Sequence, residues 1–321
     1  MEPRRYGLGI GLIVGSVFLQ SFGDALIKLE SASFTAWQIF ALRSLIVLPL
    51  LMLIMRLRAP GDPILPRSLG WVALRSALLT LMWIAYYAAL PLISLSAAAV
   101  AFYTAPLFIA LLARLVIGEA VGPTRWLGIV LGFAGVLIVL RPGADTFSPA
   151  VLLPVLAAMF YAVAAIVTRA RCLGERPLSL ALGLNAGLLV AGVLAPLIMS
   201  LAPPSAADAT AHPFLFGPWA SMGTREWALM AALALLMVCF GTGVAMAYQV
   251  APAAVIGAFD YTYVAFAVLW SYLVFGDQPD ALAVAGMALI AIGGVLVAGV
   301  RLGPAVFPSG RGRASATEEL P

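Results

Sequence analysis

One pattern of residues occurs twice in this chain, at a constant spacing of 158 positions (277 − 119) and without gaps. The pattern aligns Glu119 with Asp277, and the identical pairs at the same offset are Tyr103 and Tyr261, Thr104 and Thr262, Phe108 and Phe266, Leu111 and Leu269, Leu115 and Leu273, Val116 and Val274, Gly118 and Gly276, Gly128 and Gly286, Leu131 and Leu289, Gly135 and Gly293, and Val139 and Val297. So many matches at one offset indicate a tandem duplication. The fold is therefore expected to contain two related halves.

The composition indicates that the chain lies in a membrane. Hydrophobic residues occupy 63% of the 321 positions and charged residues 10%, whereas about a quarter of a soluble domain is charged. A helix of about 20 apolar residues crosses the hydrocarbon core of a bilayer. We place ten such runs, near residues 7–28, 36–55, 69–90, 94–117, 125–141, 150–169, 179–202, 226–248, 253–275 and 282–300. The chain is therefore predicted to be an all-α integral membrane protein.

Each copy of the pattern contains five predicted spans, and this odd number fixes how the copies are oriented. Two homologous segments of five spans must enter the bilayer in opposite directions, which is the build of many secondary transporters. We expect the first repeat over residues 1–143, the second over residues 148–301, and a short cytoplasmic tail over residues 302–321.

Basic residues are unevenly distributed between the two sides of the membrane. If the N-terminus is cytoplasmic, fourteen arginines lie on the cytoplasmic side: Arg4, Arg5, Arg56, Arg58, Arg67, Arg75, Arg114, Arg125, Arg169, Arg171, Arg176, Arg301, Arg311 and Arg313. Only Lys28, Arg141 and Arg225 then lie outside, while Arg43 falls within the second span. Since cytoplasmic connections are enriched in Lys and Arg, we expect both termini in the cytoplasm and the chain in the cell inner membrane. This bias accounts for the net charge of +4. We therefore expect the lipid bilayer as a partner and do not expect a nucleic acid.

Ionisable side chains within spans are candidates for substrate binding, because each one costs roughly 2.5 to 3.5 kcal/mol on insertion scales. Asp260 lies about two turns into the ninth span, and its counterpart in the first copy is the apolar Phe102. Its carboxylate is expected to bind the cationic group of a substrate or a coupling proton. The alternative is a carboxylate neutralised by a basic neighbour.

Other charged residues near the spans are open to two interpretations. Arg43 is expected to bind a substrate carboxylate or phosphate through its planar fork, or to pair with Asp24 and join the first two spans. Arg75, near a cytoplasmic helix end, is expected to extend its side chain to lipid phosphates. Glu119 and Asp277 lie at helix ends in opposite leaflets and are predicted to be gate or helix-end contacts.

Aromatic residues cluster at the depth where a central cavity would lie. The members that we expect to contact a substrate are Trp83, Tyr87, Tyr103, Tyr261 and Tyr263. Tyrosine hydroxyls in mid-span need hydrogen-bond partners, because hydrocarbon supplies none. These side chains indicate a cavity for a planar, amphipathic or aromatic metabolite, and ordinary aromatic core packing is the alternative. Pro106, one turn after Tyr103, is predicted to bend its span and act as a hinge.

Glycines recur every four residues on two spans. Gly7, Gly11 and Gly15 lie on the first, and Gly128 and Gly132 lie on the fifth, followed by Gly135. Such ladders let helix backbones approach closely in lipid. They predict packing within the bundle, and the fifth and tenth spans are also candidates for the interface of a homodimer.

The pattern resembles the EamA-type module of the drug/metabolite transporter superfamily. The resemblance rests on residues 90–92 (Leu-Pro-Leu), 103–108 (Tyr-Thr-Ala-Pro-Leu-Phe), 118–119 (Gly-Glu) and 140–143 (Leu-Arg-Pro-Gly), and on residues 259–262 and 275–279 of the second copy. The second copy differs in carrying Val264 at the position of Pro106 and Asp277 at the position of the usual Glu. The resemblance implies a ten-helix fold of inverted repeats, with a central cavity lined mainly by helices one to four and six to nine.

We therefore expect a secondary-active transporter that moves a small amphipathic metabolite, such as an amino acid, an aromatic compound, a nucleoside or a vitamin, by alternating access. Relatives in this superfamily also suggest S-adenosylmethionine or riboflavin import. An integral membrane enzyme acting on lipid is the competing class, but the spans carry no paired His or Asp motif and no phosphate-binding loop, and the single histidine, His212, falls in a loop. No catalytic residue, metal or cofactor is expected.

Overall fold

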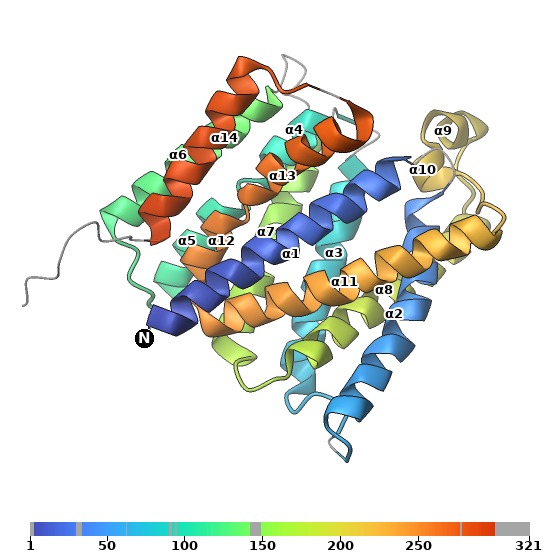
Figure 1. Ribbon diagram of the computed structural model, residues 1–321. Coiled ribbons are helices and arrows are strands. Elements are labelled where there is room, and N and C mark those ends of the chain that lie inside the picture. The colour runs from blue at the N-terminus through green and yellow to red at the C-terminus, as the bar shows by residue number, and fades with distance from the viewer. Residues whose placement is uncertain are drawn as a thin grey trace, which may run out of the picture.

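The computed structural model describes residues 3–29, 34–61, 63–89, 92–93, 95–141, 149–276 and 278–298. Asp277, both predicted repeat boundaries between residues 143 and 148, and the predicted tail lie outside the described residues. Helices joined by short connections make up the described part of the chain, which contains no strand (Figure 1). The prediction of an all-α fold is confirmed.

Ten helical segments among the described residues are long and apolar enough to cross a membrane. They comprise α1 (Pro3–Leu29), α2 (Ala36–Arg58), α3 (Leu69–Ala89), α4 (Leu95–Phe102) with α5 (Ala105–Val116), α6 (Pro123–Leu140), α7 (Leu152–Arg171) preceded by the short η2 (Pro149–Val151), α8 (Pro177–Leu201), α11 (Thr224–Val250), α12 (Ala253–Phe259) with α13 (Thr262–Trp270) and η3 (Ser271–Phe275), and α14 (Ala281–Ala298). Two short helices, α9 (Ala206–Ala211) and α10 (Pro213–Phe216), lie in the connection before α11. The ten predicted spans are found within a few residues of the predicted limits.

The helices pair in a way that repeats the duplication. Equivalent helices of the two halves are α1 and α7, α2 and α8, α3 and α11, and α6 and α14. The contact between α1 and α11 in one direction corresponds to the contact between α7 and α3 in the other. In the same way, the contact between α2 and α11 corresponds to the contact between α8 and α3. Two further pairs, α2 with α8 and α6 with α14, each join a helix to its own equivalent. The fold is therefore a ten-span bundle of two inverted five-helix repeats.

Both the fourth and the ninth spans are broken in mid-membrane. The α4 helix ends at Phe102 and α5 starts at Ala105, while α12 ends at Phe259 and α13 starts at Thr262. At each break a threonine hydroxyl donates to the carbonyl three residues earlier, from Thr104 to Ala101 at 2.6 Å and from Thr262 to Phe259 at 2.7 Å. These local bonds compete with regular helical bonding. Proline is not required for the break, since Val264 replaces Pro106 in the second copy.

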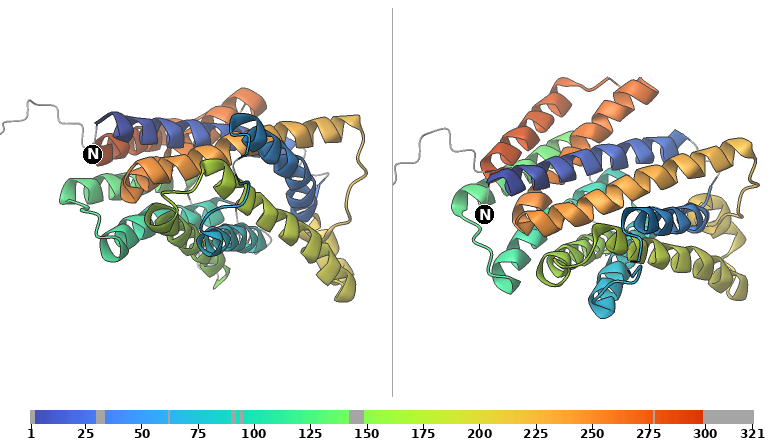
Figure 2. Two further views of the ribbon diagram at one scale, coloured as in Figure 1. Left: turned by 90° about the horizontal axis from the view of Figure 1, so that it is seen from below. Right: turned by 60° about the horizontal axis from the view of Figure 1, so that its bottom comes forward.

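The pair of α6 and α14 lies along one edge of the bundle (Figures 1 and 2). A Cβ atom at Gly128 would lie 2.6 Å from the carbonyl oxygen of Gly293, and one at Gly135 would lie 2.6 Å from that of Gly286. Any larger side chain at these positions would separate the helices. The glycines of α6 thus pack within the chain, as one of the two interpretations predicted, whereas Gly7, Gly11 and Gly15 on α1 face open space.

One end of the bundle, called the N-side below, carries the start of α1. Gly9 near that start packs against Ala251, between α11 and α12. Gln249 at the end of α11 donates to the Glu175 carbonyl oxygen at 2.8 Å, and the Glu175 carboxylate accepts from the backbone N–H of Ser68, just before α3, at 2.6 Å. The N-side therefore gathers the starts of α3 and α12 and the ends of α7 and α11. The opposite end is called the far side.

Candidate functional site

A cavity of about 410 Å³ lies in the middle of the bundle, between the two broken spans. Its volume falls in the range of small-molecule sites, roughly 300 to 1,000 Å³. Most of the lining is apolar or aromatic, and the polar side chains are Gln20, Asp24, Arg75, Tyr86, Tyr103, Tyr161, Asp260, Tyr263 and Ser271. Because these residues come from both repeats, the cavity occupies the place where inverted-repeat transporters hold their substrate.

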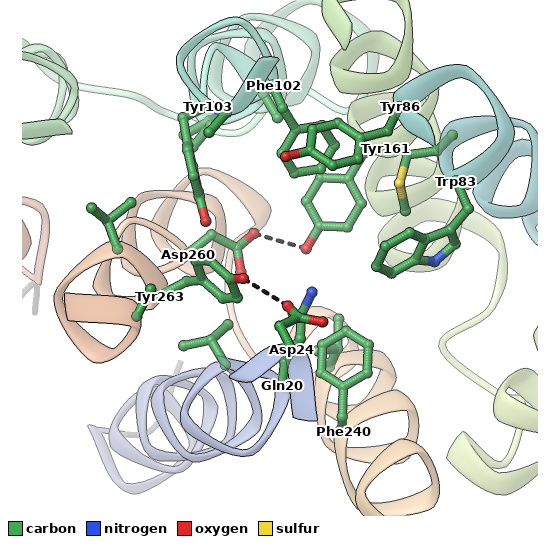
Figure 3. Close-up of a pocket in the computed structure, with 18 of the residues that line it drawn as sticks. Gln20, Asp24, Trp83, Tyr86, Phe102, Tyr103, Tyr161, Phe240, Asp260 and Tyr263 are labelled. Atoms are coloured by element: carbon green, nitrogen blue, oxygen red, sulfur yellow. Dashed lines mark hydrogen bonds between the residues drawn. The ribbon is translucent and has the colours of Figure 1, made fainter. Parts of the chain in front are cut away.

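Asp260 lies at the break between α12 and α13 and lines the cavity, with 8% of its surface exposed. Its Oδ2 atom accepts a hydrogen bond from the Tyr161 hydroxyl at 2.7 Å and another from Tyr248 at 3.2 Å (Figure 3). No Lys or Arg side chain of the described segments lies within ion-pair distance of it. The alternative of a carboxylate neutralised by a basic neighbour is therefore wrong for the described structure. Two neutral phenols hold this carboxylate in place.

Asp24 on α1 is a second carboxylate in the cavity. Its Oδ2 atom accepts a 2.6 Å hydrogen bond from the hydroxyl of Tyr263 on α13 (Figure 3). The predicted ion pair with Arg43 is not formed. Arg43 is 9% exposed, its Nε atom has no hydrogen-bond partner, and it does not belong to the cavity lining. Its predicted contact with a substrate therefore has no support from the cavity.

The expectation that the side chain of Arg75 reaches lipid phosphates is wrong. Its side chain turns inward, is 3% exposed and lines the cavity. The Nε atom donates to the Thr168 hydroxyl at 2.8 Å, and Nη1 donates to the Leu180 carbonyl oxygen at 3.2 Å. The snorkelling argument depends only on the distance from a helix end, and it cannot tell which face of the helix meets lipid. In the described part of the lining, Arg75 supplies the one cationic side chain.

Of the aromatic residues that were predicted to face one cavity, some line it in the structure and others do not. Trp83, Tyr103 and Tyr263 line it, together with Tyr86 and Phe102. Figure 3 shows these rings around the two aspartates. They make a wall suited to a flat ring, since aromatic pairs favour offset or edge-to-face contacts.

Two aromatic residues that were predicted to contact a substrate pack against other helices. Tyr261 is 1% exposed, and its ring packs against α6, where a Cβ atom at Gly132 would approach it to 2.6 Å. Tyr87 stacks on Phe40 with ring centroids 5.4 Å apart. Neither ring lines the cavity, so the expectation that Tyr103, Tyr261 and Tyr263 share it is wrong for Tyr261.

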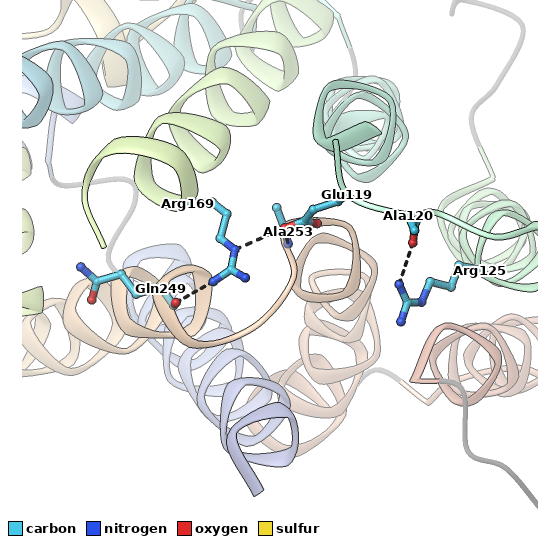
Figure 4. Close-up of polar contacts among 6 residues, drawn as sticks. All are labelled: Glu119, Ala120, Arg125, Arg169, Gln249 and Ala253. Carbon is cyan, nitrogen blue, oxygen red and sulfur yellow. Dashed lines mark hydrogen bonds and ion pairs between the residues drawn. The ribbon is translucent and has the colours of Figure 1, made fainter. Parts of the chain in front are cut away.

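A polar network joins four elements on the N-side (Figure 4). Glu119, after α5, accepts from Arg169 Nε of α7 at 3.2 Å and from the Ala253 backbone N–H of α12 at 3.2 Å. Arg169 also donates to the Gln249 carbonyl oxygen at the end of α11, at 2.7 Å. These contacts join the two repeats beside the cavity's N-side end. Pro106, the predicted hinge, lies in the first turn of α5 and lines the cavity.

An ion pair on the far side joins α6 and α14. Arg141 Nη2 lies 2.5 Å from Asp280 Oδ1, and both side chains are about half exposed. The hydrogen bond from Arg141 lowers the pKa of Asp280 to about 2, helped by the backbone N–H of Ala283. The pair therefore stays ionised at neutral pH. The sequence analysis did not single out this ion pair.

Several cavity residues were not among the predicted substrate contacts. Gln20 precedes Asp24 by one turn and lies on the same helix face, so the sequence spacing could have identified it as a cavity residue. Tyr161, which lines the cavity, and Tyr248, which lies behind Asp260 and outside the lining, could be recognised as mid-span tyrosines, but not as partners of Asp260. Phe240 carries no polar signal at all.

Ten membrane spans in two inverted repeats, with both broken spans at a central cavity, define a multi-pass membrane protein built as a transporter. Residues 7–141 match the EamA-like transporter family. Together with relatives named as transporters, this match is consistent with the drug/metabolite transporter superfamily. The findings point to a transporter rather than to an enzyme.

Three relatives illustrate the range of the family. A riboflavin transporter of Rhizobium johnstonii is 32% identical over 65% of this chain and 62% of its own length. A pseudopaline exporter, CntI, of Pseudomonas aeruginosa is 25% identical over 88% of this chain and 93% of its own. An S-adenosylmethionine uptake transporter of Rickettsia bellii is 24% identical over 89% and 92%. The chain thus spans about three fifths of the length of the riboflavin transporter.

A solved crystal structure shares the fold. It superimposes with a TM-score of 0.72 and 19% sequence identity, over 90% of this chain and 96% of the other. At this identity the likeness concerns the fold alone.

Proposed function

We propose that this protein is a secondary-active transporter of the inner membrane that moves a small amphipathic metabolite by alternating access. The observation that carries the proposal is the central cavity, which is lined at both broken spans and contacts both repeats. A site at the interface of inverted repeats can be exposed to each side in turn when one repeat rocks against the other. The broken spans supply the places where the helices can bend.

The two ends of the cavity differ. On the N-side, Glu119, Arg169 and Ala253 form hydrogen bonds between the repeats. Toward the far side, the lining continues to Leu140 at the end of α6 and Ser271 at the start of η3. With both termini in the cytoplasm, as the arginine distribution supports, this conformation has its cytoplasmic end closed and its cavity directed outward.

The cargo is a planar or partly aromatic metabolite that carries polar groups. Trp83, Tyr86 and Phe102 offer ring faces, while Asp24 and Asp260 offer hydrogen-bond acceptors. Relatives named as transporters of riboflavin and S-adenosylmethionine support a cargo of this kind. A solute gradient or exchange supplies the energy.

Flux through proteoliposomes tests the function. Purified protein is reconstituted, and labelled amino acids, nucleosides and vitamins are followed with and without a proton gradient. Saturable movement of an intact solute is expected. Asp260→Asn keeps the side-chain shape and removes the charge, so it should reduce flux at least about tenfold with little change in folded yield. Asp208→Asn, in the exposed α9 helix, is the matched control and should transport normally.

Two results would contradict the proposal. Folded protein that moves none of the solutes in either direction speaks against a transporter of this cargo class. A chemically changed product, recovered with lipid present, speaks for the membrane-enzyme alternative.

Riboflavin transport is a second candidate, favoured by three relatives named as riboflavin transporters. It predicts saturable uptake of labelled riboflavin that unlabelled riboflavin inhibits and amino acids do not. Absence of such uptake in liposomes that carry another solute would exclude this candidate alone.

A further inference from the structure

The cavity lies between two groups of helices, and each group contains helices of both repeats. In the first group, α1 packs against α11, α12 and α13, and in the second, α7 packs against α3, α4 and α5. Asp24 and Tyr263 line the cavity from the first group. Tyr86 and Tyr161 line it from the second (Figure 3). Opening the cavity to the N-side requires the two groups to separate at that end.

Gln249, in the last turn of α11, contacts the end of α7 through both its side chain and its backbone. Its Nε2 atom donates to the backbone carbonyl oxygens of Cys172 at 2.5 Å and of Glu175 at 2.8 Å. Its own carbonyl oxygen accepts a hydrogen bond from Arg169 Nη1 at 2.7 Å (Figure 4). These three bonds, called the Gln249 clasp below, join a helix of the first group to a helix of the second.

The Gln249 clasp satisfies backbone groups that a helix end leaves without partners. Cys172 is the C-cap residue of α7, and the last carbonyl groups of a helix have no acceptor role within that helix. A side-chain amide has two N–H donors, and both find a carbonyl oxygen here. Gln249 therefore caps the C-terminal end of α7 from a different helix, and it can do so only while the ends of α7 and α11 stay together.

The symmetry of the repeats does not supply the same contact on the far side. At the offset of 158 positions (249 − 91), the counterpart of Gln249 is Pro91, whose side chain has no hydrogen-bond donor. A residue needed only for the shared five-helix fold would be expected in both copies. The amide at position 249 is therefore specific to the N-side.

We propose that Gln249 is the positioning residue that holds the N-side of the cavity closed, by fastening the end of α11 to the end of α7, and that the clasp is released when the cavity opens to that side. This inference rests on the proposed function and names the residue that closes one end of its cavity. It requires no particular cargo.

Labelling of Ala105→Cys, which lines the cavity, measures how often each side opens. The background has Cys172 and Cys239 replaced by alanine, and an impermeant thiol reagent is added to inside-out vesicles or to intact spheroplasts. Pro60→Cys, at an exposed position after α2, identifies the preparation that presents the N-side. Gln249→Met keeps the length of the side chain and removes both donors. It should raise labelling from the N-side about three- to tenfold and leave labelling from the far side unchanged.

Two controls separate this role from a structural one. Gln278→Met, at an exposed position on the far side, should be labelled like the parent protein. Gln38→Met loses a comparable pair of bonds, because Gln38 of α2 donates to the Ala220 carbonyl oxygen at 2.8 Å and accepts from the Ala220 N–H at 2.9 Å. It should lower the thermal stability without raising labelling from the N-side. If Gln249→Met does not fold, Gln249→Asn, whose amide is one methylene shorter, should give the same increase.

Three outcomes overturn the clasp. The first is a folded Gln249 variant whose labelling from the N-side is unchanged, and the second is an equal increase from both sides, which indicates general loosening of the bundle. The third is an equal increase from the N-side in Gln38→Met. If the unmodified protein still moves solute in proteoliposomes, the transport function stands and only the clasp fails. Absence of flux together with absence of labelling from the N-side in every variant would refute both.

Discussion

The hydroxyl of Tyr263 lies 2.6 Å from Oδ2 of Asp24 and donates a hydrogen bond to it. Tyr263 belongs to α13 and Asp24 to α1, so this bond joins the two repeats at the wall of the cavity. Hydrogen bonds to ionised acceptors are short and strong. Any movement of α13 against α1 must carry this bond along or break it.

Tyr263→Phe tests this bond, because it removes the donor and keeps the ring. We expect the protein to fold and its free energy of unfolding to fall by about 1–3 kcal/mol, since the Asp24 carboxylate loses its partner. Flux of the transported solute should fall as well. Tyr272→Phe changes an exposed tyrosine on η3 and is the control in the measurements of thermal unfolding and flux. Equal behaviour of the two variants would show that the bond has no role.

The membrane orientation is tested with single cysteines in a background that lacks Cys172 and Cys239. Ser205, before α9, and Pro60, after α2, are both exposed and lie at opposite ends of the bundle. In intact spheroplasts, Ser205→Cys should react with an impermeant thiol reagent and Pro60→Cys should not, because the arginine bias places Pro60 in the cytoplasm. The reverse labelling pattern would invert the orientation.

Glu119 is predicted to stabilise the closed N-side. Its ion pair with Arg169 is partly exposed, with side chains at 16% and 15%, so we expect about 0.5–1 kcal/mol from it. Glu119→Gln should therefore raise the rate at which Ala105→Cys in the cavity is labelled from the N-side about two- to fivefold. The labelling is measured in inside-out vesicles.

Glu226→Gln is the control for the gate, because Glu226 caps α11 at the far side and makes its hydrogen bond to Gly223 within the same segment. Its labelling rate should match that of the unmodified protein. If Glu119→Gln also leaves the rate unchanged, Glu119 is a helix-end contact and not part of a gate.

The spans and their inverted repetition could be predicted because hydrophobic length and a constant offset are properties of the sequence alone. The mid-membrane breaks could not be predicted at the correct residues. Pro106 pointed to a bend in the first copy, but Val264 gave no such signal in the second. The feature that both breaks share is the threonine of each Tyr-Thr pair, whose hydroxyl bonds a backbone carbonyl, but threonine also occurs in continuous helices.

The partners of charged residues were the least predictable part of the site. Asp24 was expected to pair with Arg43, yet its partner is Tyr263, 239 positions away in sequence. Arg75 was assigned to lipid, yet it faces inward to Thr168. In both cases the sequence gives the depth of the residue, while the direction of its side chain depends on how helices from two repeats are rotated against each other.

Tyr103 and Tyr261 occupy equivalent positions in the two repeats but are predicted to differ in function. Tyr103 lines the cavity, whereas Tyr261 is buried against α6 and its hydroxyl has no hydrogen-bond partner. Tyr103→Ala should weaken solute affinity about two- to tenfold through lost ring contact and should leave most of the protein folded.

Tyr261→Ala should instead lower the free energy of unfolding by about 3–5 kcal/mol, because it leaves a cavity beside Gly132. Tyr261→Phe should keep or raise stability, since it removes a buried hydroxyl without a partner, and should leave affinity unchanged. Binding and thermal unfolding of the three variants separate the two roles. Equal loss of affinity in Tyr103→Ala and Tyr261→Ala at unchanged stability would mean that both rings contact the solute, and that the packing of Tyr261 against α6 is not kept in the transporting protein.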